Sequence, residues 1–129
     1  PAENVTWQKQ FMSKEAQLEY KFIFCPEGND VSTNLKWAMS SNSICFMPKP
    51  RYETWFMEGL LKPGIHYVEL KSDYSDLEEK IDYYSNHLEE AETIITNAHK
   101  HVARFQNQNL EDLLSIKVLK RYFELSGQL

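Results

Sequence analysis

Short apolar runs alternate with helical segments over the first 70 residues of the chain. Three runs of strand length, at 21–25, 43–47 and 65–70, are bounded by residues that favour turns. Three segments with helical character lie before or between them, at 8–17, 34–39 and 52–61. We expect Phe11 and Met12 on the apolar side of the first helix, and we expect Pro63 and Gly64 to end the third. This alternation predicts a parallel sheet covered by helices.

Beyond residue 70 the pattern of apolar residues is helical throughout. Three stripes recur at the spacing of a helix face and predict three helices. Their members are Leu77, Ile81 and Tyr84, then Leu88, Ala91, Ile94, Ala98, Val102 and Phe105, and then Leu110, Leu114, Val118, Tyr122 and Leu125. Ser75 and Glu78 have the spacing of a capping box at the start of the first helix. Nine acidic residues and two lysines between 69 and 92 indicate a solvated helix surface.

Length and composition fit one folded domain. The chain has 129 residues, of which 42% are hydrophobic and 26% charged, and a formal net charge of −5. Domains commonly have about 100–150 residues, so we expect residues 1–129 to form one. The negative charge argues against a nucleic-acid partner, because such a partner favours a basic face. No apolar run approaches the ~20 residues that cross a bilayer, and the start at Pro1, without an initiator methionine, indicates a piece of a longer protein.

The cysteines and histidines give no sign of a metal site or a disulfide framework. Cys25 and Cys45 lie in apolar runs twenty positions apart, which favours buried, reduced thiols. His99 and His101 point to opposite sides of a predicted helix and lack the spacing of paired metal ligands. We therefore expect neither a metal-binding residue nor a cofactor.

The segment after the first strand is the strongest candidate for binding chemistry. In an open α/β sheet, ligands bind beyond the carboxyl ends of the strands. Here the strand is followed by small and polar residues at the start of a predicted helix, whose free backbone amides favour anions. These residues are Gly28, Asn29, Asp30, Ser32, Thr33 and Asn34. The same residue types are ordinary helix caps, so the pattern allows a binding site and a structural cap alike.

Residues after the second and third strands carry weaker signals. Glu53 and Trp55 follow the second strand and His66 lies at the third, and each fits a structural role as well as a functional one. Lys49 and Arg51 lie among prolines on a predicted loop. Their positive charge suits a diphosphate, and it suits simple exposure to solvent equally well.

Several segments occur in an order that is specific to one family of enzymes. They are Glu27-Gly28-Asn29-Asp30, Ser32-Thr33-Asn34-Leu35-Lys36-Trp37, Glu53-Thr54-Trp55-Phe56, Leu61-Lys62-Pro63-Gly64-Ile65-His66-Tyr67-Val68 and Ser75-Asp76-Leu77. In this order they resemble glycosyltransferase family 90, which includes lipopolysaccharide-modifying and capsule-associated enzymes and protein O-glucosyltransferases. The resemblance extends over residues 18–125.

The resemblance implies an α/β, Rossmann-like three-layer domain with a short parallel sheet, the C-terminal half of a GT-B fold, followed by C-terminal helices. It implies binding of a sugar donor, commonly a UDP-sugar, for a transfer that inverts the sugar without a metal. With the loop chemistry above, the candidate donor-binding residues are Glu27, Gly28, Asn29, Asp30, Ser32, Thr33, Asn34, Lys36 and Glu53.

Two features of the family's donor site bear on this chain. Asn34 stands where the family has an arginine, so the lost charge and bidentate phosphate contact would have to come from Lys36, Lys49 or Arg51. The family's general base lies in the other, N-terminal half. We therefore expect no catalytic residue in this chain, and we expect the isolated chain to be inactive.

The sequence thus predicts the nucleotide-sugar-binding part of a bacterial glycosyltransferase that acts on a surface glycan such as lipopolysaccharide. The expected location is the cytoplasm, peripheral to the inner membrane, with the acceptor bound through the N-terminal half. A truncated sheet edge or an exposed apolar face would favour homo-oligomers of the fragment. An alternative from another class is a non-catalytic protein-interaction module that uses the aromatic segment 52–56 and the acidic helices.

Overall fold

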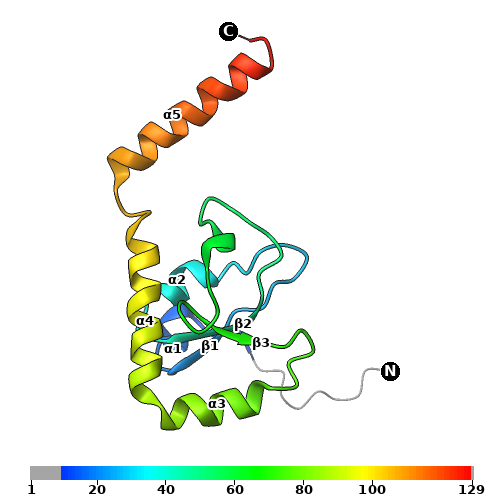
Figure 1. Ribbon diagram of the computed structural model, residues 1–129, viewed down its shortest axis with the longest axis vertical. Coiled ribbons are helices and arrows are strands. Elements are labelled where there is room, and N and C mark those ends of the chain that lie inside the picture. Colours follow the sequence, from blue (N-terminus) through cyan, green and yellow to red (C-terminus); the bar gives the residue numbers. More distant parts are fainter. Residues whose placement is uncertain (1–9, 129) are drawn as a thin grey trace.

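The structure is a computed structural model that describes residues 10–128 (Figure 1). It has an α/β fold, with a three-stranded parallel sheet followed by C-terminal helices, as the sequence predicts. The elements in chain order are α1 (Lys14–Gln17), β1 (Phe22–Phe24), α2 (Leu35–Met39), β2 (Ile44–Pro48), the 3-10 helix η1 (Glu58–Leu60), β3 (Val68–Leu70), α3 (Leu77–Asn86), α4 (Leu88–Ala103) and α5 (Gln108–Leu125).

The sheet has the strand order β1-β2-β3, and both pairs of neighbouring strands are parallel. In β2 the four residues from Ile44 to Met47 are buried, which explains its unbroken apolar run. A strand that is covered on both faces does not alternate between apolar and polar residues. Parallel pairing brings the carboxyl ends of the three strands to one edge, where ligands bind in open α/β sheets.

Helices cover both faces of the sheet. One apolar cluster joins β1 and β2 to α2, and its members include Ile23, Cys25, Leu35, Ala38, Met39, Cys45 and Met47. The other cluster joins β2 and β3 to α3, and its members include Ile44, Phe46, Val68, Leu70 and Tyr84. Ala98 of α4 packs in the first cluster and Ile94 in the second, so this helix ties the two sides together. Figure 1 shows α4 running along one side of the sheet.

The two cysteines are buried free thiols, which confirms the prediction. Cys25 follows β1 directly, and Cys45 lies in β2. The neighbouring Cys45 thiol and burial both raise the pKa of Cys25. Both cysteines therefore act as small apolar side chains in the core.

The prediction of a helix over 8–17 is largely wrong. The helix α1 begins only at Lys14, because the hydroxyl of Ser13 caps it by accepting a hydrogen bond of 3.2 Å from the amide of Ala16. Phe11 and Met12 precede the helix, and Phe11 is 96% exposed, so the expected apolar face does not form. Residues 8 and 9 lie outside the described part of the chain.

The predicted helix over 52–61 is also wrong. This segment forms turns and the short helix η1, and Met57 has a left-handed backbone with φ of 55°. The carboxylate of Glu58 accepts hydrogen bonds from the amide and the hydroxyl of Thr54, at 2.6 and 2.8 Å. These bonds to a side chain take the place of helical bonds between backbone groups.

The predicted capping box at α3 does not form. The N-cap residue is Asp76, and its carboxylate accepts a hydrogen bond of 2.9 Å from the amide of Lys71 instead of capping the helix. The amide of Ser75 donates to the carboxylate of Asp73 at 3.1 Å. The loop between β3 and α3 is therefore held by its own acidic side chains.

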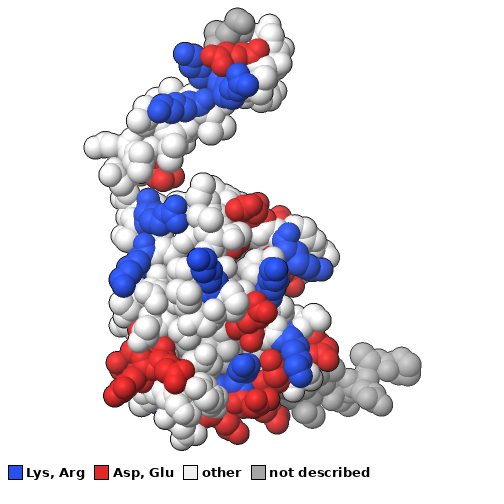
Figure 2. Space-filling view, viewed as in Figure 1, with Lys and Arg blue, Asp and Glu red and all other residues white. Residues whose placement is uncertain are grey.

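The three C-terminal helices occur where the apolar stripes place them, but they differ in burial. The helices α3 and α4 pack on the sheet, whereas α5 has no buried residue. Figure 1 shows α5 extending away from the rest of the molecule. The acidic side chains of α3 and of the start of α4 are exposed, and Figure 2 shows acidic atoms gathered over this region. They form the solvated surface that the sequence predicts.

Candidate functional site

A hollow of about 380 Å³ lies at the carboxyl ends of the strands. Its lining comes from the loops that follow all three strands, and comprises Glu27, Pro48, Lys49, Arg51, Glu69, Leu70, Lys71, Ser72 and Tyr74. A smaller hollow of about 220 Å³ shares Lys49 and Glu69 with it. Parallel sheets bind their ligands in this position, because loops from neighbouring strands converge there.

Glu27 joins the loop after β1 to the loop after β2. Its carboxylate accepts hydrogen bonds from the backbone amides of Arg51 and Tyr52 at 3.0 and 3.2 Å, and from Nε of Arg51 at 3.2 Å. Both carboxylate oxygens take part, so Glu27 is fully occupied within the protein. Of the donor-binding candidates, Glu27 is the one that lines the hollow.

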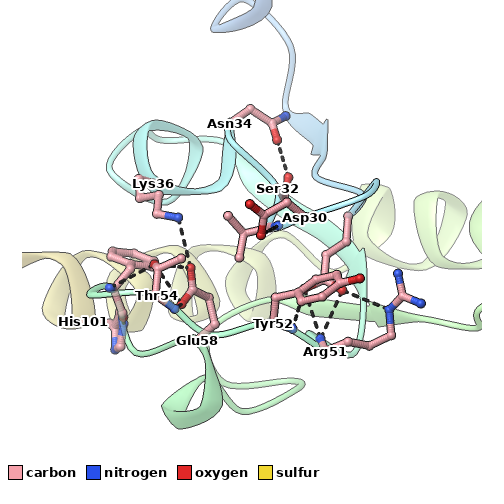
Figure 3. Close-up of polar contacts among 12 residues, drawn as sticks. Asp30, Ser32, Asn34, Lys36, Arg51, Tyr52, Thr54, Glu58 and His101 are labelled. Carbon is pink, nitrogen blue, oxygen red and sulfur yellow. Dashed lines mark hydrogen bonds and ion pairs between the residues drawn. The ribbon is translucent and has the colours of Figure 1, made fainter.

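The rest of the loop after β1 is held by bonds within itself and to the strand. Nδ2 of Asn34 donates to the carbonyl of Phe24 at 3.0 Å, and the hydroxyl of Ser32 donates to Oδ1 of Asn34 (Figure 3). The carboxylate of Asp30 accepts from the amide of Val31 at 2.8 Å. Asn34 is the N-cap of α2, but its side chain does not cap the helix. The amide of Asn34 thus holds the loop to β1.

The backbone of this loop does not require a glycine. The amide of Gly28 donates to the carbonyl of Asp30 at 3.1 Å, and a Cβ atom at Gly28 would meet no other atom within 4 Å. Asn29 and Thr33 are exposed, whereas Ser32 is buried. A Cβ atom at position 28 would therefore lie in open space.

Lys36 belongs to a separate cluster with Glu58 and Thr54, as Figure 3 shows. Its Nζ lies 3.0 Å from Oε1 of Glu58, whose side chain is only 2% exposed. Burial alone raises the pKa of Glu58, but hydrogen bonds from the amide and hydroxyl of Thr54 and from Lys36 outweigh it, so the pKa lies below the usual value. Lys36 therefore pairs with a buried carboxylate of the protein.

Glu53 is exposed and lies against Gly59. A Cβ atom at Gly59 would lie 3.1 Å from Oε1 of Glu53, so the absence of a side chain at Gly59 leaves room for this carboxylate. Nearby, the ring of Trp55 packs edge-to-face on Phe56 and Phe105 and is 64% exposed.

Two histidines lie close together beneath the segment 52–61. The ring centroids of His66 and His101 are 5.8 Å apart, and Nε2 of His101 donates to the carbonyl of Phe56 at 2.9 Å. Burial lowers the pKa of both rings, and the proximity of His101 lowers that of His66 further. His101 thus holds the backbone at Phe56, and Nδ1 of His66 accepts a hydrogen bond of 3.0 Å from the amide of Lys62, which fits a structural role for both rings.

The structure thus does not gather the candidate residues at a single place. Glu27 lines the hollow, Ser32 and Asn34 brace the loop after β1, and Lys36 pairs with Glu58. The hollow is also lined after β3 by residues outside the predicted site, Lys71, Ser72 and Tyr74. The sequence does indicate these residues, because they follow the predicted strand 65–70 and ligands bind beyond the carboxyl ends of strands.

The fold and the position of the hollow define a class of protein, an α/β domain that can bind a ligand at the carboxyl ends of its parallel strands. The family model named Glycosyl transferase family 90 matches residues 2–126, and the chain belongs to that family. Within residues 10–128, no three side chains of the kinds that bind metals are grouped so as to hold an ion. No helix of this part is long and apolar enough to pass through a membrane.

The curated proteins to which the chain is similar include O-glucosyltransferases. It is 50% identical over 119 residues to O-glucosyltransferase LpsA of Dichelobacter nodosus, covering 92% of this chain and 37% of the relative. It is 33% identical over 77 residues to Protein O-glucosyltransferase 2 of Danio rerio, covering 60% of this chain and 15% of the relative. The chain therefore spans little more than a third of the length of LpsA.

Proposed function

We propose that this chain is the part of a family 90 glycosyltransferase that binds the nucleotide-sugar donor, a UDP-sugar. The observation that carries the proposal is the hollow at the carboxyl ends of β1, β2 and β3, in a chain that belongs to this family. The names of its relatives make a glucosyl group the first sugar to test. The proposed architecture is one Rossmann-like domain, half of a GT-B enzyme.

The chemistry of sugar transfer supports a donor-binding role for this chain and a separate location for the catalytic base. An inverting transfer needs a base that accepts the proton of the acceptor hydroxyl, and positive groups that stabilise the departing diphosphate. The hollow carries cationic side chains from two loops, which suits the second task. We place the base and the acceptor, a surface glycan such as lipopolysaccharide, in a further part of the enzyme.

The remaining parts of the proposal follow the family. The transfer is inverting and needs no metal ion, and the enzyme works in the cytoplasm, peripheral to the inner membrane. The alternative of a protein-interaction module has one observation in its favour, the exposed ring of Trp55. Membership of an enzyme family favours the glycosyltransferase.

A titration of the chain with UDP and UDP-glucose tests the proposal. We expect saturable changes in amide chemical shifts at Glu27, Lys49 and Lys71, which line the hollow, and little change in α5. UDP-glucose and UDP should compete for the same shifts. Absence of binding up to millimolar ligand, or shifts confined to the aromatic segment 52–56, would overturn donor binding by this chain.

A further inference from the structure

Three cationic side chains line the same hollow, and they come from the ends of two strands. Lys49 and Arg51 follow β2, and Lys71 follows β3. The loop after β1, residues 26–34, contains no lysine or arginine. The positive charge at this edge of the sheet is therefore supplied by the loops after β2 and β3.

The acidic side chains of the hollow are already bonded to the protein. Both oxygens of Glu27 accept from the Arg51 and Tyr52 groups described above, and Oε2 of Glu69 accepts from the hydroxyl of Tyr67 at 2.9 Å. These bonds consume the acceptor capacity of Glu27 and one oxygen of Glu69. They also fix where the carboxylates lie.

The cations, by contrast, keep donors that face solvent. Arg51 uses Nε for Glu27 and is 67% exposed, so its terminal nitrogens remain able to bind an anion. Within residues 10–128, Lys49 and Lys71 have no carboxylate within 4.0 Å. Lys36 differs from them, because its ammonium group pairs with the buried carboxylate of Glu58.

Asn34 is not able to take over the phosphate contact of the arginine that it replaces. Its amide nitrogen donates to the carbonyl of Phe24 and its oxygen accepts from Ser32. An amide also lacks the charge and the two parallel donors that hold phosphate oxygens. The charge that balances a diphosphate must come from elsewhere in the site.

We propose that Lys49, Arg51 and Lys71 hold the diphosphate of the nucleotide-sugar donor in the hollow at the ends of β2 and β3. This assignment rests on the proposed function and identifies the part of the chain that neutralises the donor's charge. Glu27 acts as a positioning residue, because its bonds to Arg51 fix the loop that carries two of the cations. The diphosphate then becomes the leaving group beside three positive charges, which stabilises it during transfer.

The test compares UDP, UMP and uridine as ligands of the full chain by calorimetry at low salt. The variants are Lys49→Ala, Lys71→Ala and the double substitution. Lys117→Ala on α5 is the matched control, since it removes another exposed cation that does not line the hollow. We expect each single variant to weaken UDP binding about tenfold, as for the loss of a charge-assisted hydrogen bond. Uridine binding should not change, so the preference for UDP over uridine should fall with each substitution.

Each outcome of this test decides one question. If wild type binds UDP and the preference for UDP over uridine survives in the double variant, the diphosphate assignment is overturned and the proposed function stands. If wild type binds none of the three ligands, both are overturned. An equal loss in Lys117→Ala would also overturn the assignment, because it would show a general effect of net charge. Melting temperatures of all variants establish that each one is folded.

Discussion

Glu58 is a buried carboxylate that organises the segment 52–61. Its two oxygens accept from Thr54 and Lys36, and its side chain is almost inaccessible to water. A buried charge is tolerated when it is paired and fully hydrogen-bonded, and removing one partner leaves the other uncompensated. The fold of this segment therefore depends on the ionised state of one side chain.

The first prediction concerns the pH dependence of stability. The pKa of Glu58 is lowered in the folded state, so the unfolded chain binds a proton more readily, and the stabilisation is present above the ordinary glutamate pKa of about 4.3. It is lost as the pH falls from there through the lower pKa of the folded state. We expect Glu58→Gln to cost about 2 kcal/mol at pH 7 and to flatten this loss, as followed by urea unfolding from pH 7 to 3.

The matched control is Glu92→Gln, at an exposed position of α4. It should leave both the free energy of unfolding and its pH dependence close to those of wild type. An equal flattening in the two variants would mean that Glu58 has no special part in acid unfolding.

Gly59 gives a prediction for the donor candidate Glu53. The substitution Gly59→Ala would crowd the carboxylate of Glu53, which is exposed and free to move away. We expect a change in unfolding free energy within about 0.5 kcal/mol together with weaker UDP-glucose binding, measured by denaturant unfolding and calorimetry. In the background of Glu53→Ala the effect on binding should vanish. A loss that persists there would show that Gly59 acts without Glu53.

At the scale of elements, α4 is central to the packing of the domain, because its residues pack in both apolar clusters. Ile94 is buried in the second cluster, which also holds residues of the sheet and of α3. We expect Ile94→Ala to lower the free energy of unfolding by about 2–5 kcal/mol, through lost burial and the cavity left behind. The measurement is urea unfolding followed by circular dichroism. The substitution Thr93→Ala, on the exposed side of the same helix, is the control and should cost much less.

At the scale of the whole molecule, we expect substitutions in α5 to have little effect on stability, in contrast to substitutions in α4. It carries many exposed apolar side chains, among them Ile116, Val118 and Leu119, and contributes none to the core. We expect Ile116→Lys and Val118→Lys to leave the melting temperature of the body unchanged within about 2 °C, as scanning calorimetry would measure. A drop comparable to that of Ile94→Ala would mean that α5 packs on the sheet in solution.

The order of elements was predictable because buried strands and helical stripes leave strong local patterns. The apolar runs around Ile23, Cys45 and Val68 each became a strand, and the stripes after residue 76 became α3, α4 and α5. The segment 52–61 was not predictable in the same way. Its form depends on Glu58 bonding to Thr54 and to Lys36 of another element, and helical spacing in the sequence carries no trace of those contacts.

The candidate site was predictable only in part, for a related reason. The sequence predicts Glu27 as a site residue because it lies in a polar loop after a strand. Which residues share the hollow with Glu27 depends on the order of the strands in the sheet. Because β2 lies between β1 and β3, Lys49, Arg51 and Lys71 line one hollow together with Glu27. Whether the loop 27–36 and Glu53 contact the donor stays a prediction.

The two buried thiols allow the opening of the core to be measured by their reactivity. Cys25 follows β1, Cys45 lies in the central strand β2, and both are buried in the core and free. A thiol reagent reaches them only when the sheet opens, because burial and a raised pKa suppress the reactive thiolate of Cys25 in the native state. The rate at which the native chain is alkylated therefore reports the opening of the core, without any engineered residue.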